Sequence, residues 1–308
     1  MRELKVTLET VTPLFLGGAD PRGAPELRPP SVRGALRYWL RAALGGVIGD
    51  RNLDGLHRLE SAVFGSTDYG SIIQVRLKGG LKCADTPILP HKSTVKGQRN
   101  AFIAGQPIDL ILSQYRDADE TVWQAACSTL ALALTFGGVG LRSRRGYGTF
   151  RIVQSSDSEL VPPTPDSLDE WPKHIQQIVR SAVTAMSALA RAYGVPTPDL
   201  RNDPARYPCA TRVGLIRITD LQASSALDAV RQFMYKVPQN QALGGIRPRQ
   251  ASPLWVRPIV TAPGRYGLLL IVLASQLKQG TDYDFVRRFL DRDFPVAGQD
   301  IQVKGWNT

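Results

Sequence analysis

The sequence predicts an α+β protein in which two similar domains, residues 1–154 and 155–308, follow one another with inserted loops and helices. Three observations support this class. The 308 residues are enough to build two ordinary hydrophobic cores. Segments with strand-like and helix-like apolar spacing alternate in both halves. A stretch rich in Pro, Ser and Asp, residues 155–172, separates the halves as a connector.

Six elements are expected in the first half. The apolar residues Val122, Ala126, Leu130 and Ala133 recur at intervals of four, four and three, which places them on one face of a helix. Ser31 is a typical capping residue and is expected to begin the first helix. The elements are a strand at 3–9, a helix at 31–47, strands at 71–78 and 107–115, a helix at 119–136 and a strand at 147–153. This is the order of ferredoxin-like and RNA-recognition-type domains.

The second half repeats most of that order after a long helix at 171–193. Its elements are a strand at 212–221, a helix at 226–236, strands at 252–260 and 266–274 and a helix at 283–290. We interpret it as a degenerate ferredoxin-like copy of the first domain with a helical insertion, although the two sequences barely match.

The charge of the chain favours a polyanionic partner. Lys and Arg number 38 against 27 Asp and Glu, so the net charge is +11. Nucleic acid is the first candidate and an anionic membrane the second. The longest apolar run, 266–274, is too short to cross a bilayer. The odd number of scattered cysteines, without metal-ligand spacing to the three histidines, predicts reduced thiols in a cytoplasmic protein and no metal or cofactor.

A cationic glycine loop, "GGVGLRSRRGYGTF" at 137–150, joins the second helix to the fourth strand. Its spacing fits neither a dinucleotide fingerprint nor a P-loop. "RGYGTF" matches the first four positions of an RNA-recognition signature and then departs. One interpretation is an RNA contact, and the other is a tight turn with solvated arginines. The candidate RNA-binding residues are Gly138, Gly140, Arg142, Arg144, Arg145, Gly146, Tyr147 and Gly148, with Tyr147 either a stacking platform or a core residue.

Further basic residues are candidates for the same role. Arg33, Arg37 and Arg41 are spaced by four, so they form one stripe beside the apolar face of the first helix, and Arg28 precedes them. A solvated helix face is the alternative. Lys92 lies in a basic insertion at 76–99 that is either an RNA-reaching loop or an ordinary surface loop. Arg247 and Arg249 belong to a second Gly and Arg loop, "LGGIRPRQ".

Catalytic groups are sparse. His91 beside Lys92 has the chemistry for metal-independent RNA cleavage, with the imidazole as general base. Asp20 has the chemistry for a metal-assisted cut, but an Asp-Pro pair is typical of local turn chemistry. We expect no catalytic residues.

Four segments, "TPLFLGG", "ELRPPSVRGALRYWLRAALGG", "GGVGLRSRRGYGTF" and "RQASPLWVRP", together resemble the RAMP superfamily of CRISPR proteins, most closely the first-numbered RAMP subunit of the type III-B (Cmr) effector. The resemblance implies two ferredoxin-like domains in a non-catalytic, RNA-binding subunit of an antiviral ribonucleoprotein. It implies as partners the CRISPR guide RNA and target RNA near the guide 3′ end, other RAMP subunits and the polymerase-like large subunit. It also implies that the glycine loop and the Arg33 helix face RNA or neighbouring subunits, and that another subunit cuts the target.

Two other functions stay open. Some RAMP proteins are metal-independent endoribonucleases that process guide RNA, which is the enzymatic alternative. The other is a scaffold whose arginines meet acidic protein surfaces.

Overall fold

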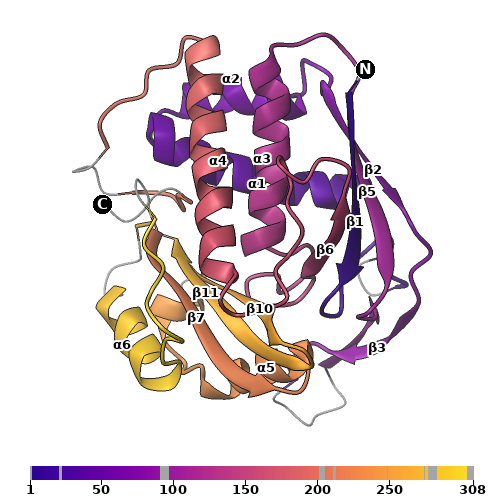
Figure 1. Ribbon diagram of the computed structural model, residues 1–308, viewed down its shortest axis with the longest axis vertical. Coiled ribbons are helices and arrows are strands. Elements are labelled where there is room, and N and C mark those ends of the chain that lie inside the picture. Colours follow the sequence, from indigo (N-terminus) through magenta and orange to yellow (C-terminus); the bar gives the residue numbers. More distant parts are fainter. Residues whose placement is uncertain are drawn as a thin grey trace.

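A four-stranded antiparallel sheet forms the frame of the first half (Figure 1). The computed structural model describes residues 2–20, 23–90, 97–200, 205–210, 213–247, 249–273, 275–276 and 283–303. The strands of this sheet lie in the order β2-β5-β1-β6, and every neighbouring pair is antiparallel. Counting only these four strands, the order is second, third, first, fourth, which is the ferredoxin-like arrangement predicted from the element order. Their bounds are β1 Arg2–Thr10, β2 Ile73–Lys78, β5 Pro107–Gln114 and β6 Phe150–Ser155.

The two helices of this ferredoxin-like unit are α1 (Pro29–Ile48) and α3 (Glu120–Phe136). Asp119 caps α3, because its side chain accepts a hydrogen bond from the Thr121 amide. The prediction that Ser31 caps the first helix is wrong, since α1 begins two residues earlier. Two prolines open it, and proline suits a first turn because its missing N–H would have no helical acceptor there.

The structure also contains elements that the sequence analysis did not predict. Helix α2 (Leu53–Phe64) follows α1, and Asn52 caps it by accepting from the Gly55 amide at 3.0 Å. The basic insertion contains a hairpin of β3 (Cys83–Pro87) and β4 (Gln98–Phe102). Strand β6 begins at Phe150, three residues later than predicted, so Tyr147 belongs to the loop.

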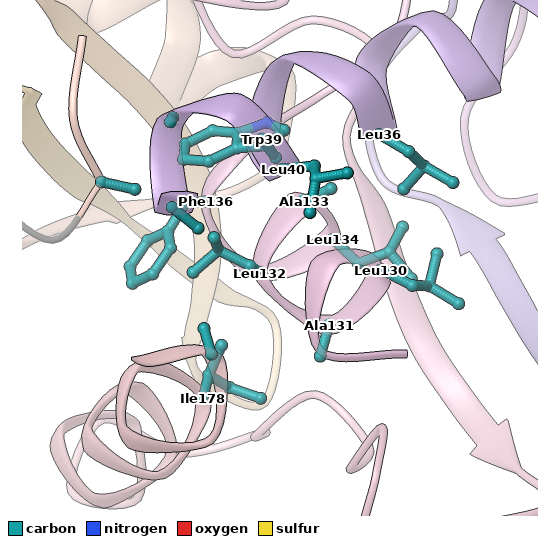
Figure 2. Close-up of a cluster of buried hydrophobic side chains, with 14 of the residues drawn as sticks. Leu36, Trp39, Leu40, Leu130, Ala131, Leu132, Ala133, Leu134, Phe136 and Ile178 are labelled. Carbon is teal, nitrogen blue, oxygen red and sulfur yellow. The ribbon is translucent and has the colours of Figure 1, made fainter. Parts of the chain in front are cut away.

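Helix α4 (Trp171–Ala192) packs against α1 and α3 of the first half (Figure 1). Ten of its side chains are buried, at the spacing of one helix face. The proposed domain boundary near residue 155 therefore precedes a helix whose packing partners lie in the first half. Figure 2 shows the shared core, in which Leu36, Trp39 and Leu40 of α1 face the apolar side chains of α3, with Ile178 of α4 nearby.

The second half contains a three-stranded antiparallel sheet in the order β10-β11-β7. Its strands are β7 Val213–Ala223, β10 Leu254–Ala262 and β11 Arg265–Leu273, and its helices are α5 Ala226–Lys236 and α6 Tyr283–Asp293. A short 3₁₀ turn, η2 (Gln241–Leu243), and a two-residue hairpin of β8 (Gly245–Ile246) and β9 (Arg249–Gln250) separate α5 from β10.

The place of a fourth strand is taken by the irregular segment after α6. The Ala297 and Ile301 amides donate to the carbonyl oxygens of Ile218 and Ile216 on β7, at 2.7 and 2.8 Å. The order β10-β11-β7 followed by this segment is again the ferredoxin-like order, with the last strand reduced to two hydrogen bonds. The α+β class is confirmed. The second copy is degenerate because this irregular segment stands in place of its fourth strand.

Both faces of the second sheet are buried. On β11, Leu268, Leu270 and Val272 belong to the core under α5 and α6, while Leu269 and Ile271 belong to the core shared with α1, α3 and α4. Successive strand residues point to opposite faces, so a strand covered on both sides must be apolar throughout. This accounts for the uninterrupted apolar run at 266–274.

Candidate nucleic-acid interface

The glycine loop lies between the two halves of the chain, and one buried arginine holds both of its ends. Arg257 of β10 donates from Nη1 to the Gly137 carbonyl oxygen at 3.3 Å and from Nη2 to the Phe150 carbonyl oxygen. The Arg257 side chain is 2% exposed. Burial lowers its pKa to about 9, because desolvation disfavours the charged form.

The glycines of the loop are needed for packing against the protein itself. Gly148 has φ +63, and a Cβ there would collide with the Val139 carbonyl oxygen of the opposite arm. Gly146 has φ +84, and a Cβ there would lie 2.7 Å from Cγ2 of Val230 on α5. Only glycine adopts such conformations without strain. The interpretation that these glycines admit an RNA backbone is replaced by close approach of the chain's own segments, as it is for Gly138 and Gly140.

Arg144 is bound by the second half of the chain and by α1. Its Nη1 donates to the Ser252 carbonyl oxygen at 2.8 Å. The guanidinium lies over the rings of Trp255 and Tyr38, at 4.9 and 5.4 Å from their centres. Such cation–π contacts stabilise by roughly 0.5–2 kcal/mol each. Arg144 therefore joins the two halves, and we withdraw it from the candidate RNA contacts.

Arg145 occupies a similar position one residue later. Its Nη2 donates to the Leu243 carbonyl oxygen at 2.5 Å, and its guanidinium lies 5.9 Å from the Phe233 ring centre. Its Nη1 is buried without a hydrogen-bond partner. Burial, and then repulsion by Arg142 and Arg144, lowers the pKa of Arg145 to about 10. Burying this charged group costs solvation free energy.

Arg142 is the loop arginine that remains available. Its backbone has φ +61 and its carbonyl oxygen accepts from the Arg145 amide at 2.8 Å, but its half-buried side chain makes no hydrogen bond or ion pair with a residue in the described ranges. Burial lowers its pKa. Among the described residues, neither Arg142 nor its two loop neighbours pairs with a carboxylate. The loop thus carries three guanidinium groups whose charge no carboxylate in the described ranges neutralises.

Tyr147 is a core residue. Its ring is fully buried, lies 5.1 Å from the Phe15 ring centre, and its hydroxyl donates to the Pro87 carbonyl oxygen at 2.9 Å. Burial raises its pKa to about 12. The alternative in which Tyr147 stacks on a base is excluded by this burial, because a stacking platform must present a ring face to solvent.

The arginine stripe of α1 is divided between two roles. Arg37 and Arg41 both pair with Glu60 of α2, whose side chain is 12% exposed, at 2.6 and 2.9 Å. Arg37 also donates to the carbonyl oxygens of Phe64 and Gly65 at the end of α2. The expectation that the whole stripe stands apart from the fold is wrong for these two residues. Arg33 makes no ion pair with any described residue and stays accessible.

The remaining cationic candidates lie at the surface. Arg247 and Arg249 are exposed on the β8–β9 hairpin. Arg28 occupies the position before α1 without a capping hydrogen bond from its side chain, and its Nε lies 3.8 Å from a carboxylate oxygen of Glu26. Lys92 and His91 fall outside the described residues.

Of the candidate catalytic groups, Asp20 is the one that the described residues include. Asp20 lies in a turn, where its carbonyl oxygen accepts from the Gly23 amide at 3.2 Å. His174 is buried, its Nε2 lies 3.3 Å from the Thr135 hydroxyl, and burial together with the Arg257 charge lowers its pKa to about 4. In the described part of the chain, no group of three His, Cys, Asp or Glu residues is placed to hold a metal ion.

No helix within those same ranges has the length and apolar composition needed to cross a membrane.

Two structurally important residues were missed by the sequence analysis. Arg257 sits in "LWVRPIV", where a charged residue interrupts an apolar strand, and such an interruption is a signal of a buried polar contact. Glu60 carries no comparable signal, because α2 itself was not predicted.

The comparisons with known proteins agree with one another. The family model described as RAMP superfamily matches residues 7–151. The CRISPR system Cmr subunit Cmr1-2 of Pyrococcus furiosus is 31% identical over 184 residues, which is 49% of this chain and 96% of that protein. Subunit Cmr1-1 of the same organism is 27% identical over 190 residues, covering 56% of this chain and 55% of that protein.

Solved structures share the fold over nearly the whole chain. The crystal structure of apo Cmr1 from Pyrococcus furiosus has a TM-score of 0.69 at 21% identity and covers 99% of this chain and all of that one. A chain of the type III-B Cmr-beta complex bound to cognate target RNA, studied by cryo-electron microscopy, has a TM-score of 0.58 at 12% identity and covers 94% of this chain and 98% of that one.

Proposed function

The chain belongs to the RAMP superfamily, in the group of Cmr1 subunits of type III-B CRISPR complexes, and from this we propose that it is a non-catalytic subunit that contacts RNA. The proposed partners are the guide RNA and target RNA near the guide 3′ end, the other RAMP subunits and the polymerase-like large subunit. A structural relative of this chain comes from a complex bound to cognate target RNA, which supports RNA as a partner.

One observation carries the proposal, namely the unneutralised charge of the glycine loop. Three guanidinium groups within four residues lack a carboxylate partner among the described residues, and Arg142 has a side chain free to bind. Phosphate is the anion that guanidinium groups bind with bidentate geometry. The net charge of +11 adds a long-range attraction for a polyanion.

The RNA-binding set is narrower than the sequence alone suggested. We retain Arg28, Arg33, Arg142, Arg247 and Arg249, because their side chains reach solvent and none has a hydrogen bond that fixes it in the core. The other loop residues and the Glu60-bound arginines support the fold instead, and Arg145 keeps one unbound group, its Nη1, beside the bond that its Nη2 makes to Leu243. Lys92 stays a proposal without a structural description.

The proposed lack of catalysis is supported by the surroundings of the candidate groups. A general base must exchange protons near neutral pH and reach its substrate, and His174, which was not a candidate, is buried with a low pKa. The turn that contains Asp20 matches the local role typical of an Asp-Pro pair.

A direct test uses the purified chain and labelled single-stranded RNAs of unrelated sequence, in EDTA and in Mg²⁺. We expect salt-sensitive binding with similar affinity for each sequence, because phosphate contacts carry no base information, and we expect the RNA to stay intact. A defined cleavage product that disappears in Asp20→Ala or His91→Ala would establish the endoribonuclease instead. Binding to acidic proteins without binding to RNA would establish the scaffold.

A further inference from the structure

A groove opens beside the glycine loop, at the junction of the two halves. Its volume is about 670 Å³, within the range of about 300–1,000 Å³ that is usual for small-molecule sites. Arg142 and Arg145 line it from the loop, Leu89 from the segment after β3, and Met234 and Val237 from the end of α5. Gln241 and the glycines of the β8–β9 hairpin complete it.

In each of two polar side chains of the groove, one terminal atom has a hydrogen-bond partner and another has none. Arg145 donates from Nη2 to Leu243, and its buried Nη1 has no partner. Gln241 donates from Nε2 to the Arg247 carbonyl oxygen at 2.9 Å, and its buried Oε1 has no partner. A buried donor or acceptor without a partner is costly, so a ligand that bonds to both atoms would remove that cost.

The charge of the groove favours an anion. Arg142 and Arg145 are close enough for each to affect the other, since repulsion by Arg142 contributes to the lowered pKa of Arg145. In the described part of the chain no carboxylate pairs with either. A phosphate between them would replace this repulsion with two attractive contacts.

Part of the remaining lining is apolar, beside the polar residues Gln239 and Asn240. Leu89, Met234, Val237 and Leu243 form the wall, and Ile246, which is 88% exposed, stands at the rim. An exposed isoleucine beside an apolar groove offers a surface on which a flat base can lie. We infer that this groove holds one unstacked nucleotide of single-stranded RNA, its phosphate on Arg142 and Arg145 and its base against the apolar wall, within reach of Gln241.

This inference rests on the proposed RNA-binding function, and it adds a nucleotide subsite to a charged surface. The test is a titration of the full chain with AMP, adenosine and inorganic phosphate, beside a titration with single-stranded RNA. AMP should bind saturably and at least tenfold more tightly than adenosine or phosphate. Only AMP carries both a phosphate for the two arginines and a base for the apolar wall.

Two variants address the groove, and one serves as a control. Val237→Trp fills the groove without changing the charge, and Arg142→Gln removes one phosphate contact while keeping the backbone conformation equally strained. Each should weaken AMP binding at least tenfold. Arg288→Gln changes the same charge at an exposed position of α6 and should leave AMP binding within twofold. Thermal unfolding of each variant checks folding, and Arg142→Gln alone decides the matter if Val237→Trp does not fold.

The outcomes separate the two proposals. Intact RNA binding without saturable AMP binding would overturn the nucleotide subsite and leave the proposed function standing. AMP binding that neither groove variant weakens would also overturn the subsite. A wild-type chain that does not bind single-stranded RNA would overturn the proposed function.

Discussion

Arg257 on β10 and Gly137 at the start of the glycine loop are joined by a hydrogen bond of 3.3 Å from Nη1 to the carbonyl oxygen. The same guanidinium binds the carbonyl oxygen of Phe150, the first residue of β6 after the loop. A cation from the second half thus closes a loop of the first half, and the loop in turn places Arg144 and Arg145 against the second half.

The first prediction concerns this clamp. Arg257→Lys keeps the charge but removes the planar fork that reaches two carbonyl oxygens at once. Because a buried carbonyl is then left without a donor, we expect the free energy of unfolding to fall by about 1–3 kcal/mol. Denaturant unfolding measures this. Arg265→Lys, at the exposed start of β11, is the control, and equal stability of the two variants would show that the clamp contributes nothing.

The second prediction separates the residues of the arginine stripe. Arg37→Gln removes the ion pair with Glu60 and two hydrogen bonds to the end of α2, so we expect a loss of roughly 1.5–3 kcal/mol, the value typical of hydrogen bonds to charged groups. Arg33→Gln, one helical turn earlier, should change stability by less than about 0.5 kcal/mol, as surface substitutions do. Similar losses for both variants would contradict the division of the stripe.

The third prediction follows from His174. Its pKa in the folded protein is about 4, below the usual value of about 6.5, so the unfolded chain takes up a proton first as the pH falls. The stability contributed by the neutral ring is complete above pH 6.5 and is lost progressively as the pH falls towards 4. Between pH 7 and pH 4.5 the loss from this group should be about 2–3 kcal/mol.

Comparison with His174→Phe isolates that contribution, because phenylalanine keeps a ring against Trp171 and does not titrate. The variant should lose less stability than the wild type over the same pH interval in denaturant unfolding. Parallel pH profiles for the two proteins would mean that His174 titrates normally.

Much of the fold was predictable from local patterns. The bounds of α4 and α5 follow from their apolar periodicity, and the observed strand order is consistent with the ferredoxin-like arrangement predicted from the order of elements. The start of α1 was misplaced because two prolines can replace a side-chain cap. The hairpin of β3 and β4 escaped prediction because its strands, CADTP and QRNAF, are short and show no alternation of apolar and polar residues.

The site was harder to predict than the fold. A sequence shows that Arg142, Arg144 and Arg145 are cations, but it does not show which acceptors lie nearby. Those acceptors, the carbonyl oxygens of Ser252 and Leu243, come from residues about 100 positions later in the chain. The pairing of Arg37 with Glu60 depends in the same way on tertiary packing.

The fourth prediction concerns Arg144. Arg144→Gln removes the hydrogen bond to Ser252 and the contacts with Tyr38 and Trp255, so the free energy of unfolding should fall by about 1–3 kcal/mol. Because Arg144 is committed to the protein, the salt dependence of RNA binding should change little. A flattened salt dependence at unchanged stability would return Arg144 to the RNA-binding set.

The central claim, that Arg142, Arg247 and Arg249 bind RNA phosphates, is tested most directly by salt titration of single-stranded RNA binding. Replacing all three by Gln should flatten the slope of log affinity against log salt by about 2, since each phosphate contact contributes about 0.7 on a single strand. The matched triple variant Arg287→Gln, Arg288→Gln, Arg292→Gln on α6 loses the same charge and should retain the wild-type slope within about 0.5. An unchanged slope in the first variant, or equal flattening in both, would contradict the claim.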